Sequence, residues 1–127
     1  MSQSYRMMSL LDVDAALPEN EQEFWKEILY RCTECPTDVL EEGDDSSDPD
    51  TVSVYIRKDG VTRFCCEMEI MLCGGYSQDD YAEDFRKAMH QLTKDVAEPD
   101  FTVAINCYYL EHDPDLEVKY SRKDLAA

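Results

Sequence analysis

The sequence has few of the residues on which most enzyme active sites depend. It contains only four glycines and two histidines, His90 and His112, among 127 residues. No glycine-rich phosphate loop is present, and no serine lies in the glycine-flanked turn that carries the nucleophile of many hydrolases. Both histidines have acidic neighbours, as most of this chain does, and we interpret them as surface residues. We therefore expect a protein that is not an enzyme and that has no cofactor.

Positive charge is also scarce. Lysine and arginine number 12 against 29 aspartates and glutamates, which gives a formal charge of -17 and a pI near 4.2. Such an excess repels nucleic acid and anionic membranes and attracts basic proteins. Disorder is the usual consequence of high charge, but 43% hydrophobic residues and eight tyrosines are too many for a chain that cannot fold. We expect a folded protein with a basic protein partner, and binding to neither nucleic acid nor membrane.

Long apolar runs, which signal peptides and membrane-spanning helices need, are absent from the sequence. Near the start of the chain, Ser9, Asp12 and Asp14 interrupt the apolar residues, so neither a signal peptide nor a transmembrane span is predicted. We expect a cytoplasmic protein whose thiols stay reduced. The six cysteines are then small buried hydrophobes rather than a disulfide framework: Cys32, Cys35, Cys65, Cys66, Cys73 and Cys107.

Two groups of residues in the sequence could supply metal ligands. Cys32 and Cys35 with Cys65 and Cys66 supply four thiols, but neighbours on a strand point to opposite faces, which disfavours zinc. A redox role for Cys32 and Cys35 is disfavoured because acidic residues surround them at a helix C-terminus. The acidic run from Asp44 has the oxygen spacing of a calcium loop but proline at its sixth position. We predict no metal site.

A β-hairpin from Thr51 to Cys73 is the clearest structural signal. Asp59-Gly60 suits a tight turn, and both flanks alternate between apolar and polar residues. One face is predicted to line the core, and the other to face water or a partner. The core-facing residues are expected to be Val52, Val54, Ile56, Phe64, Cys66, Met68, Ile70 and Leu72.

Two helices and two further strands complete the prediction. Helical spacing predicts one helix from Leu17-Pro18 to Cys35, with Phe24, Ile28 and Cys32 buried, and a second that starts at the cap residue Ser77. Residues 101–110 and 116–121 alternate as strands. We expect residues 1–13 to be an arm or short edge strand, 37–50 an acidic loop and 122–127 a frayed tail.

The predicted fold class is therefore α+β, with residues 1–127 in one domain. The simplest packing of the order α-β-β-α-β-β is a four-stranded, largely antiparallel sheet with both helices on one face. The other face stays open. Its candidate residues are Tyr55, Arg57, Arg63, Glu67, Glu69, Met71, Asn106, Tyr108 and Leu110.

Carboxylates on a folded scaffold can occupy sites that normally bind phosphate. In composition and architecture the chain resembles small acidic inhibitors, such as phage anti-restriction and anti-CRISPR proteins that act as DNA mimics, and toxin-immunity proteins. The resemblance implies inhibition of a nuclease or another nucleic-acid-binding protein. The predicted partner-binding residues are Glu41, Glu42, Asp44, Asp45, Asp48, Asp50, Asp79, Asp80, Glu83 and Asp84, with Tyr55 and Tyr108 as anchors.

Two alternatives remain open at this stage. An immunity protein bound to its own toxin would use the same electrostatics against a single partner. An adaptor or subunit would instead dock through the open sheet face, with Tyr55, Tyr108 and Leu110 carrying the affinity and little response to salt. A second copy of the chain could also cover that face.

Overall fold

The elements of this chain form a small single domain of the α+β class. The structure, a computed structural model, describes residues 3–41, 49–72, 74–109 and 115–127. Within these residues it contains one antiparallel sheet of five strands, four α-helices and one 3₁₀ turn. The elements are β1 (Gln3–Val13), α1 (Glu19–Glu34), α2 (Pro36–Leu40), η1 (Pro49–Thr51), β2 (Ser53–Ile56), β3 (Thr62–Leu72), α3 (Gln78–Thr93), β4 (Phe101–Tyr108), β5 (Leu116–Ser121) and α4 (Arg122–Ala126).

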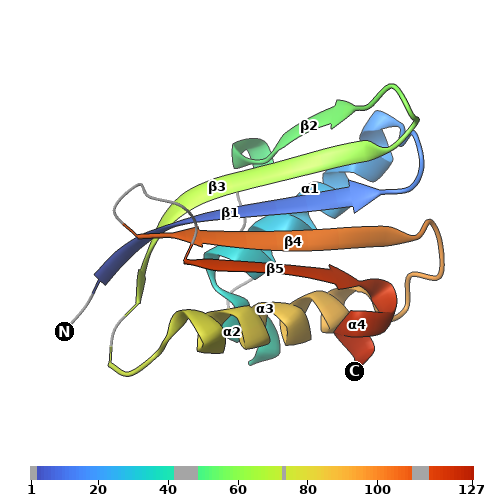
Figure 1. Cartoon of the computed structure of the whole chain (residues 1–127). Coiled ribbons are helices and arrows are strands. Elements are labelled where there is room, and N and C mark those ends of the chain that lie inside the picture. Colours follow the sequence, from blue (N-terminus) through green and yellow to red (C-terminus); the bar gives the residue numbers. More distant parts are fainter. Residues whose placement is uncertain (1–2, 42–48, 73, 110–114) are drawn as a thin grey trace.

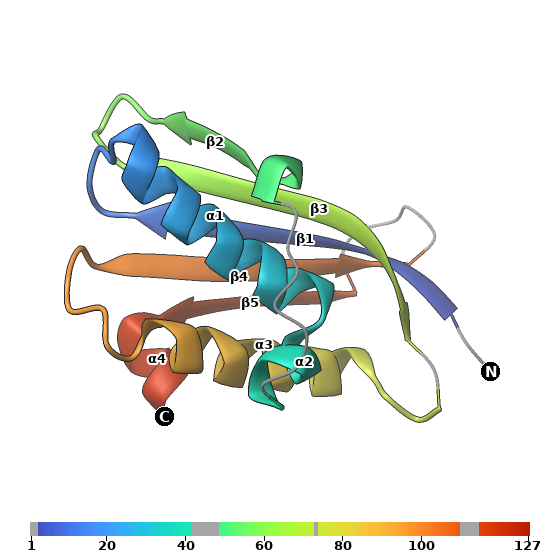
Figure 2. The same cartoon turned by 180° about the vertical axis from the view of Figure 1, so that it is seen from behind.

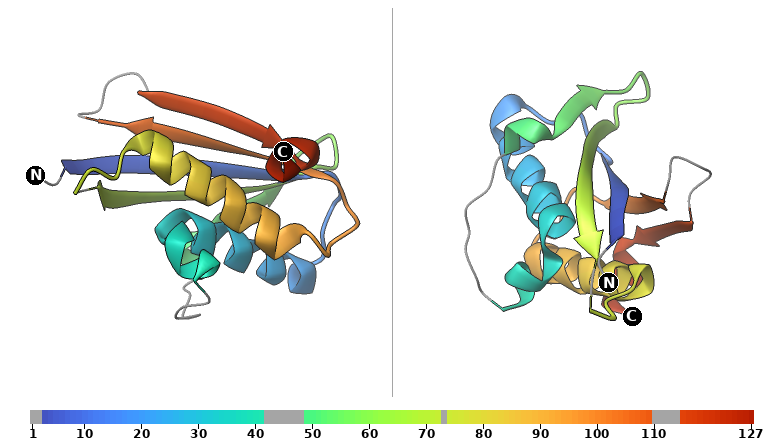
Figure 3. Two further views of the ribbon diagram at one scale, coloured as in Figure 1. Left: turned by 90° about the horizontal axis from the view of Figure 1, so that it is seen from below. Right: turned by 90° about the vertical axis from the view of Figure 1, so that its left-hand side faces the viewer.

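The sheet has the order β2-β3-β1-β4-β5, and each neighbouring pair is antiparallel. Both long helices lie on the same side of it, α1 against β3 and β1, and α3 along β5 (Figures 1 and 2). Among the described residues, no helix lies on the opposite side (Figure 3). Since side chains alternate along a strand, the register gives each strand one core-facing and one open-facing row. The predicted arrangement of helices on one face is thus confirmed, while the number and order of the strands differ.

The largest correction concerns residues 1–13, which were predicted as an arm or edge strand. From Gln3 they form β1, the central strand of the sheet, paired along its length with β3 and over Arg6–Val13 with β4. Met7, Leu11 and Val13 are fully buried. The apolar alternation is broken by Ser9, whose Oγ lies 2.6 Å from the buried Oγ1 of Thr33. That hydrogen bond permits a serine in the core.

Helix α1 also differs from its prediction. Its buried stripe is Trp25, Ile28, Leu29, Cys32 and Thr33, while the side chain of Phe24 is 48% exposed. Ile28 and Cys32 are buried as predicted, but Trp25 takes the buried position expected for Phe24 and packs against Phe101 at 5.4 Å between ring centroids. The helix then restarts as α2, where an acidic loop was predicted, because Pro36 is favourable at a first helical position.

The hairpin and the second long helix are confirmed. Strand β2 pairs antiparallel with β3, and Gly60 in the turn has a φ of 84°, which favours glycine. Ile56 was predicted to line the core, but it is 50% exposed because β2 is the edge strand of the sheet. Helix α3 begins after Ser77, whose hydroxyl accepts from the amide of Asp80 while the Asp80 carboxylate accepts from the amide of Ser77. This reciprocal cap satisfies two amides that the first turn of the helix leaves unpaired.

The C-terminal residues were predicted to fray, and this is wrong. Arg122–Ala126 form α4, which begins with a second reciprocal cap between Ser121 and Asp124. Leu125 is only 1% exposed, and Nη1 of Arg86 donates to its carbonyl oxygen at 2.6 Å. One buried leucine and one arginine therefore fix the tail to α3.

Candidate functional site

The predicted acidic loop lies only partly in the described chain. Glu42, Asp44, Asp45 and Asp48 fall outside the described residues, so their arrangement stays a prediction. Glu41 follows the last turn of α2 and Asp50 belongs to η1, and both are exposed.

The four predicted carboxylates of α3 are mostly engaged within the domain. Asp80 caps the helix, and the amide and hydroxyl of Ser77 lower its pKa. The guanidinium of Arg86 lies 2.6 Å from Glu83, whose pKa it also lowers. Asp84 accepts a hydrogen bond of 2.5 Å from Tyr76. Among the described residues, only Asp79 of the four lacks a hydrogen bond or ion pair, so α3 offers fewer free carboxylates than its sequence suggests.

Tyr55 and Tyr108 both lie on the open side of the sheet, as predicted, but they do not meet. Tyr55 pairs with Arg63 at the β2 edge, whereas Tyr108 pairs with Arg6 of the central strand. Arg63 and the β3 partner of Arg6 are six residues apart, which corresponds to about 20 Å along a strand. The two tyrosines cannot form one anchor.

The open sheet face is nearly balanced in charge, in contrast to the whole chain. Among the described residues this side carries four cations and five anions: Arg6, Arg57, Arg63 and Lys119 against Asp12, Asp59, Glu67, Glu69 and Glu117. The excess of negative charge therefore lies elsewhere on the molecule. A partner attracted by charge would not be drawn to this face in particular.

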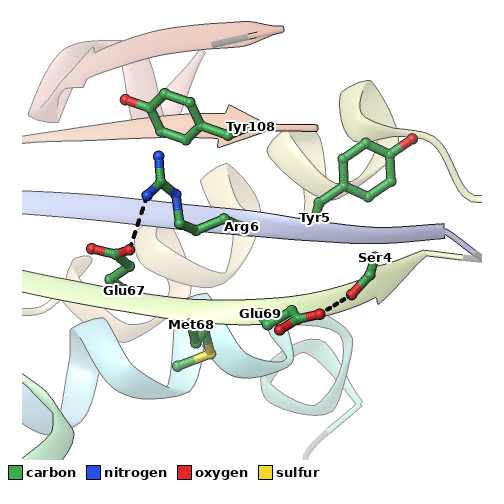
Figure 4. Close-up of a pocket in the computed structure, with 7 residues that line it drawn as sticks. All are labelled: Ser4, Tyr5, Arg6, Glu67, Met68, Glu69 and Tyr108. Atoms are coloured by element: carbon green, nitrogen blue, oxygen red, sulfur yellow. Dashed lines mark hydrogen bonds and ion pairs between the residues drawn. The ribbon is translucent and has the colours of Figure 1, made fainter. Parts of the chain in front are cut away.

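Several of these charges neutralise one another directly. Arg63 donates from Nε and Nη2 to the two carboxylate oxygens of Asp12 at 2.7 and 2.8 Å. Arg6 lies 3.5 Å from Glu67 and stacks over the ring of Tyr108 at 4.4 Å, beside a hollow of about 480 Å³ (Figure 4). Such paired groups suit a surface in contact with water.

The pairing of Asp12 predicts a dependence of stability on pH. The hydrogen bonds from Arg63 lower the pKa of Asp12 below its ordinary value of 3.8. A carboxylate with a lowered pKa stabilises the fold above its ordinary pKa, and that contribution is lost as the pH falls through the lower, folded value. We expect Asp12→Asn to cost about 1 kcal/mol at pH 7 and progressively less as the pH falls below the ordinary pKa of an aspartate.

Urea denaturation of wild type and variant across this pH range measures the difference. Glu117→Gln is the control, because Glu117 lies on the same face without an ion pair in the described chain. A cost for Asp12→Asn that stayed constant down to the lowest pH would contradict an electrostatic origin.

Four carboxylates that the sequence analysis did not single out surround a hollow at one end of the sheet. Asp14, Glu21, Glu98 and Asp100 line a volume of about 750 Å³ where β1 ends and β4 begins. All four are exposed. We call these four residues the acidic hollow. They come from three separate segments, so no local sequence pattern marks them. The segments of Asp14 and Asp100 meet where the backbone amide of Asp14 donates to the carbonyl oxygen of Asp100 at 2.8 Å.

Among the described residues around the four carboxylates of the acidic hollow, Arg122 is the one cation, and most of its N–H groups already donate hydrogen bonds. Its guanidinium donates to the carbonyl oxygens of Val96 and Pro99 and to Asp100, and it stacks over Phe101 at 4.7 Å. Within the described chain the carboxylates of Asp14, Glu21 and Glu98 make no hydrogen bond or ion pair. This site therefore presents unneutralised negative charge, which can accept lysine or arginine side chains.

An exposed aromatic side chain lies about one helical turn from Glu21 on α1. Phe24 follows Glu21 by three residues on α1 and so shares its side of the helix. Its exposure, described above, makes it available for contact with an approaching surface. An exposed aromatic next to carboxylates is a favourable arrangement for binding cationic groups.

The described cysteines do not converge on a common centre. Cys65 and Cys66 point to opposite faces of β3, and Cys32 and Cys66 are buried. Burial raises the pKa of Cys66 to about 11 and that of Cys32 still further, so neither thiol is reactive near neutral pH. Within the described residues, no three side chains of His, Cys, Asp or Glu are grouped as metal ligands.

The described residues form an acidic α+β domain in which one sheet face carries no helix and nearly balanced charge, and one end is acidic. Comparison with known proteins adds nothing to this class: no family model, curated protein or solved structure matches the chain. In the described part of the chain, no helix combines the length and apolarity needed to cross a bilayer.

Proposed function

We propose that this chain is a non-enzymatic inhibitor that binds the basic nucleic-acid-binding site of a nuclease or a related protein. The acidic hollow is the observation that carries the proposal. Its carboxylates are exposed and mostly unpaired, and their charge can replace that of phosphates in a groove of lysine and arginine side chains.

The distribution of charge supports the same proposal. The described residues of the open sheet face carry four cations and five anions, so most of the formal charge of -17 lies on other parts of the chain. A negative electrostatic potential over one part of the surface orients a basic partner as it approaches. The acidic hollow and the predicted loop from Glu41 to Asp50 are the two candidate contact sites within that surface.

Affinity capture from lysate with the tagged protein tests this function. We expect capture of basic nucleic-acid-binding proteins that is lost in high salt or with competing duplex DNA, because charge contacts weaken as ionic strength rises. Capture of a neutral partner that resists high salt would reject the proposal and favour the adaptor that docks through the open face.

Two variants with the same net charge locate the contact. One replaces Asp14, Glu21, Glu98 and Asp100 by their amides, and the other replaces Asp44, Asp45, Asp48 and Asp50 by asparagine. Because each removes four negative charges, any difference between them reports position rather than total charge. We expect the first variant to lose about tenfold or more in affinity for the captured partner.

The other outcomes are equally informative. A loss confined to the second variant would move the contact to the loop, and equal losses would show that net charge alone attracts the partner. A toxin-immunity role shares this electrostatics and is separated from the main proposal by the number of partners captured. A single tight partner is expected for an immunity protein.

A further inference from the structure

The outer edge of β3 is only partly covered. Strand β2 pairs with β3 from Ile56 to Ser53, and the last pair joins Ser53 to Cys65. Strand β3 then continues to Leu72, paired on its inner side with β1. The 3₁₀ turn η1 lies beside the start of this second half, where Thr51 hydrogen-bonds to Cys66 (Figure 2). Beyond it, no other strand of the described chain pairs with the outer side of β3. An uncovered strand edge is a template for pairing with another chain.

The direction of the backbone groups on this edge follows from the hairpin. The amide of Arg57 donates to the carbonyl of Val61 at 2.7 Å, so odd-numbered residues of β3 direct their amide and carbonyl groups outward. The register with β1 has no interruption, and the pattern therefore extends to Glu67, Glu69 and Met71. All three are exposed, Met71 by 64%.

A small apolar pocket lies beside the same edge, on the helix side of the sheet. Its volume is about 260 Å³, and it lies between β3 and the junction of α1 with α2. Pockets for small molecules are usually larger, about 300 Å³ or more, so this one suits a single side chain. Its apolar lining comes from Cys35, Pro36, Ile70, Leu72, Tyr76 and Tyr81.

We propose that an extended segment of a protein partner adds to this edge as an antiparallel strand, with alternating basic and apolar side chains. Its residue opposite Ile70 would enter the pocket, since side chains directly opposite each other share a face. Its residues opposite Glu67 and Glu69 would be lysine or arginine, because at contact distance they can pair with Glu69, which has no ion pair in the described chain, and with Glu67, which lies 3.5 Å from Arg6. This binding mode uses a different surface from the acidic hollow and does not depend on it.

A peptide pair tests the proposal without changing the protein. The probe is a fluorescent, end-capped nonapeptide that alternates lysine and leucine, and its binding is followed by anisotropy. In the proposed pairing the amides of its lysines face β3, because opposite residues of such a pair exchange their hydrogen bonds. N-methylation of the lysine amides is expected to weaken binding about tenfold or more, and N-methylation of the leucine amides far less.

A protein pair gives a second, independent readout. Glu69→Pro removes an outward amide without disturbing the bonds of β3 to β1, and proline is tolerated at such edge positions. Glu69→Gln is its control, since it changes charge but keeps the amide. We expect the proline variant to lose about tenfold more affinity than the glutamine variant. Circular dichroism verifies that both fold, and the peptide pair remains decisive if the proline variant does not.

Two results would overturn the proposal. Equal binding of both methylated peptides would mean that charge alone attracts the probe. Slow hydrogen exchange at Glu67, Glu69 and Met71 in the free protein, together with a dimer in light scattering, would mean that a second copy occupies the edge. The variant of the acidic hollow is expected to keep peptide affinity within about threefold, so failure of the proposed inhibitor function leaves this result unaffected.

Discussion

Replacement of Leu11 by alanine is expected to lower the free energy of unfolding by about 3 kcal/mol. Leu11 is fully buried in the central strand and pairs with Phe64 on one side and Val103 on the other. The truncated side chain would leave a cavity under α1 that its well-packed neighbours can fill only in part. The shift of the urea midpoint at unchanged slope measures the loss.

Leu10→Ala is the matched control for this variant. Leu10 is the preceding residue of the same strand, but its side chain lies on the open face between Cys65 and Ala104. Because it remains partly exposed, its loss is expected to cost about 1 kcal/mol. Similar costs for the two leucines would contradict the register, since a strand shifted by one residue would exchange their faces.

Truncation of Leu125 is expected to have the next largest effect, a loss of about 2 to 3 kcal/mol. The residue is buried against α3, and the hydrogen bond from Arg86 holds its carbonyl oxygen. Thermal and urea denaturation of Leu125→Ala measure the loss. Lys123→Ala, an exposed position in the same short helix, is expected to change stability by less than about 0.5 kcal/mol. A fully frayed tail would give no difference between the two.

The sequence predicted elements whose signals are local. The turn at Asp59-Gly60 and the cap at Ser77 are each encoded within a few residues, and both were correct. The central strand was missed because its core-facing alternation includes Ser9, which is compatible with burial only through Thr33, far along the chain. The tail was missed for a similar reason, because Leu125 is buried by contacts with α3 rather than by a pattern of its own.

The residues of the candidate site also differ in whether local sequence could place them. Sequence correctly indicated which residues of the hairpin face away from the helices, because alternation along a strand is a local property. It did not indicate that Asp84 accepts a hydrogen bond from Tyr76, since that contact depends on how the residues before α3 fold back on the helix. Nor did it indicate which cation at helical spacing would pair with Glu83. Nor could it bring Glu21 close to Glu98, which lie in different halves of the chain.

The position of β1 in the middle of the sheet has a consequence for the order of folding. Strand β1 is synthesised before both of the strands with which it pairs, β3 and β4. Such non-local pairing slows folding, because distant segments must meet before the contacts they form can repay the lost chain entropy. On a ribosome, β1 would keep its β4 edge unpaired until Tyr108 has emerged. We infer that this domain folds late in its own synthesis, as one unit.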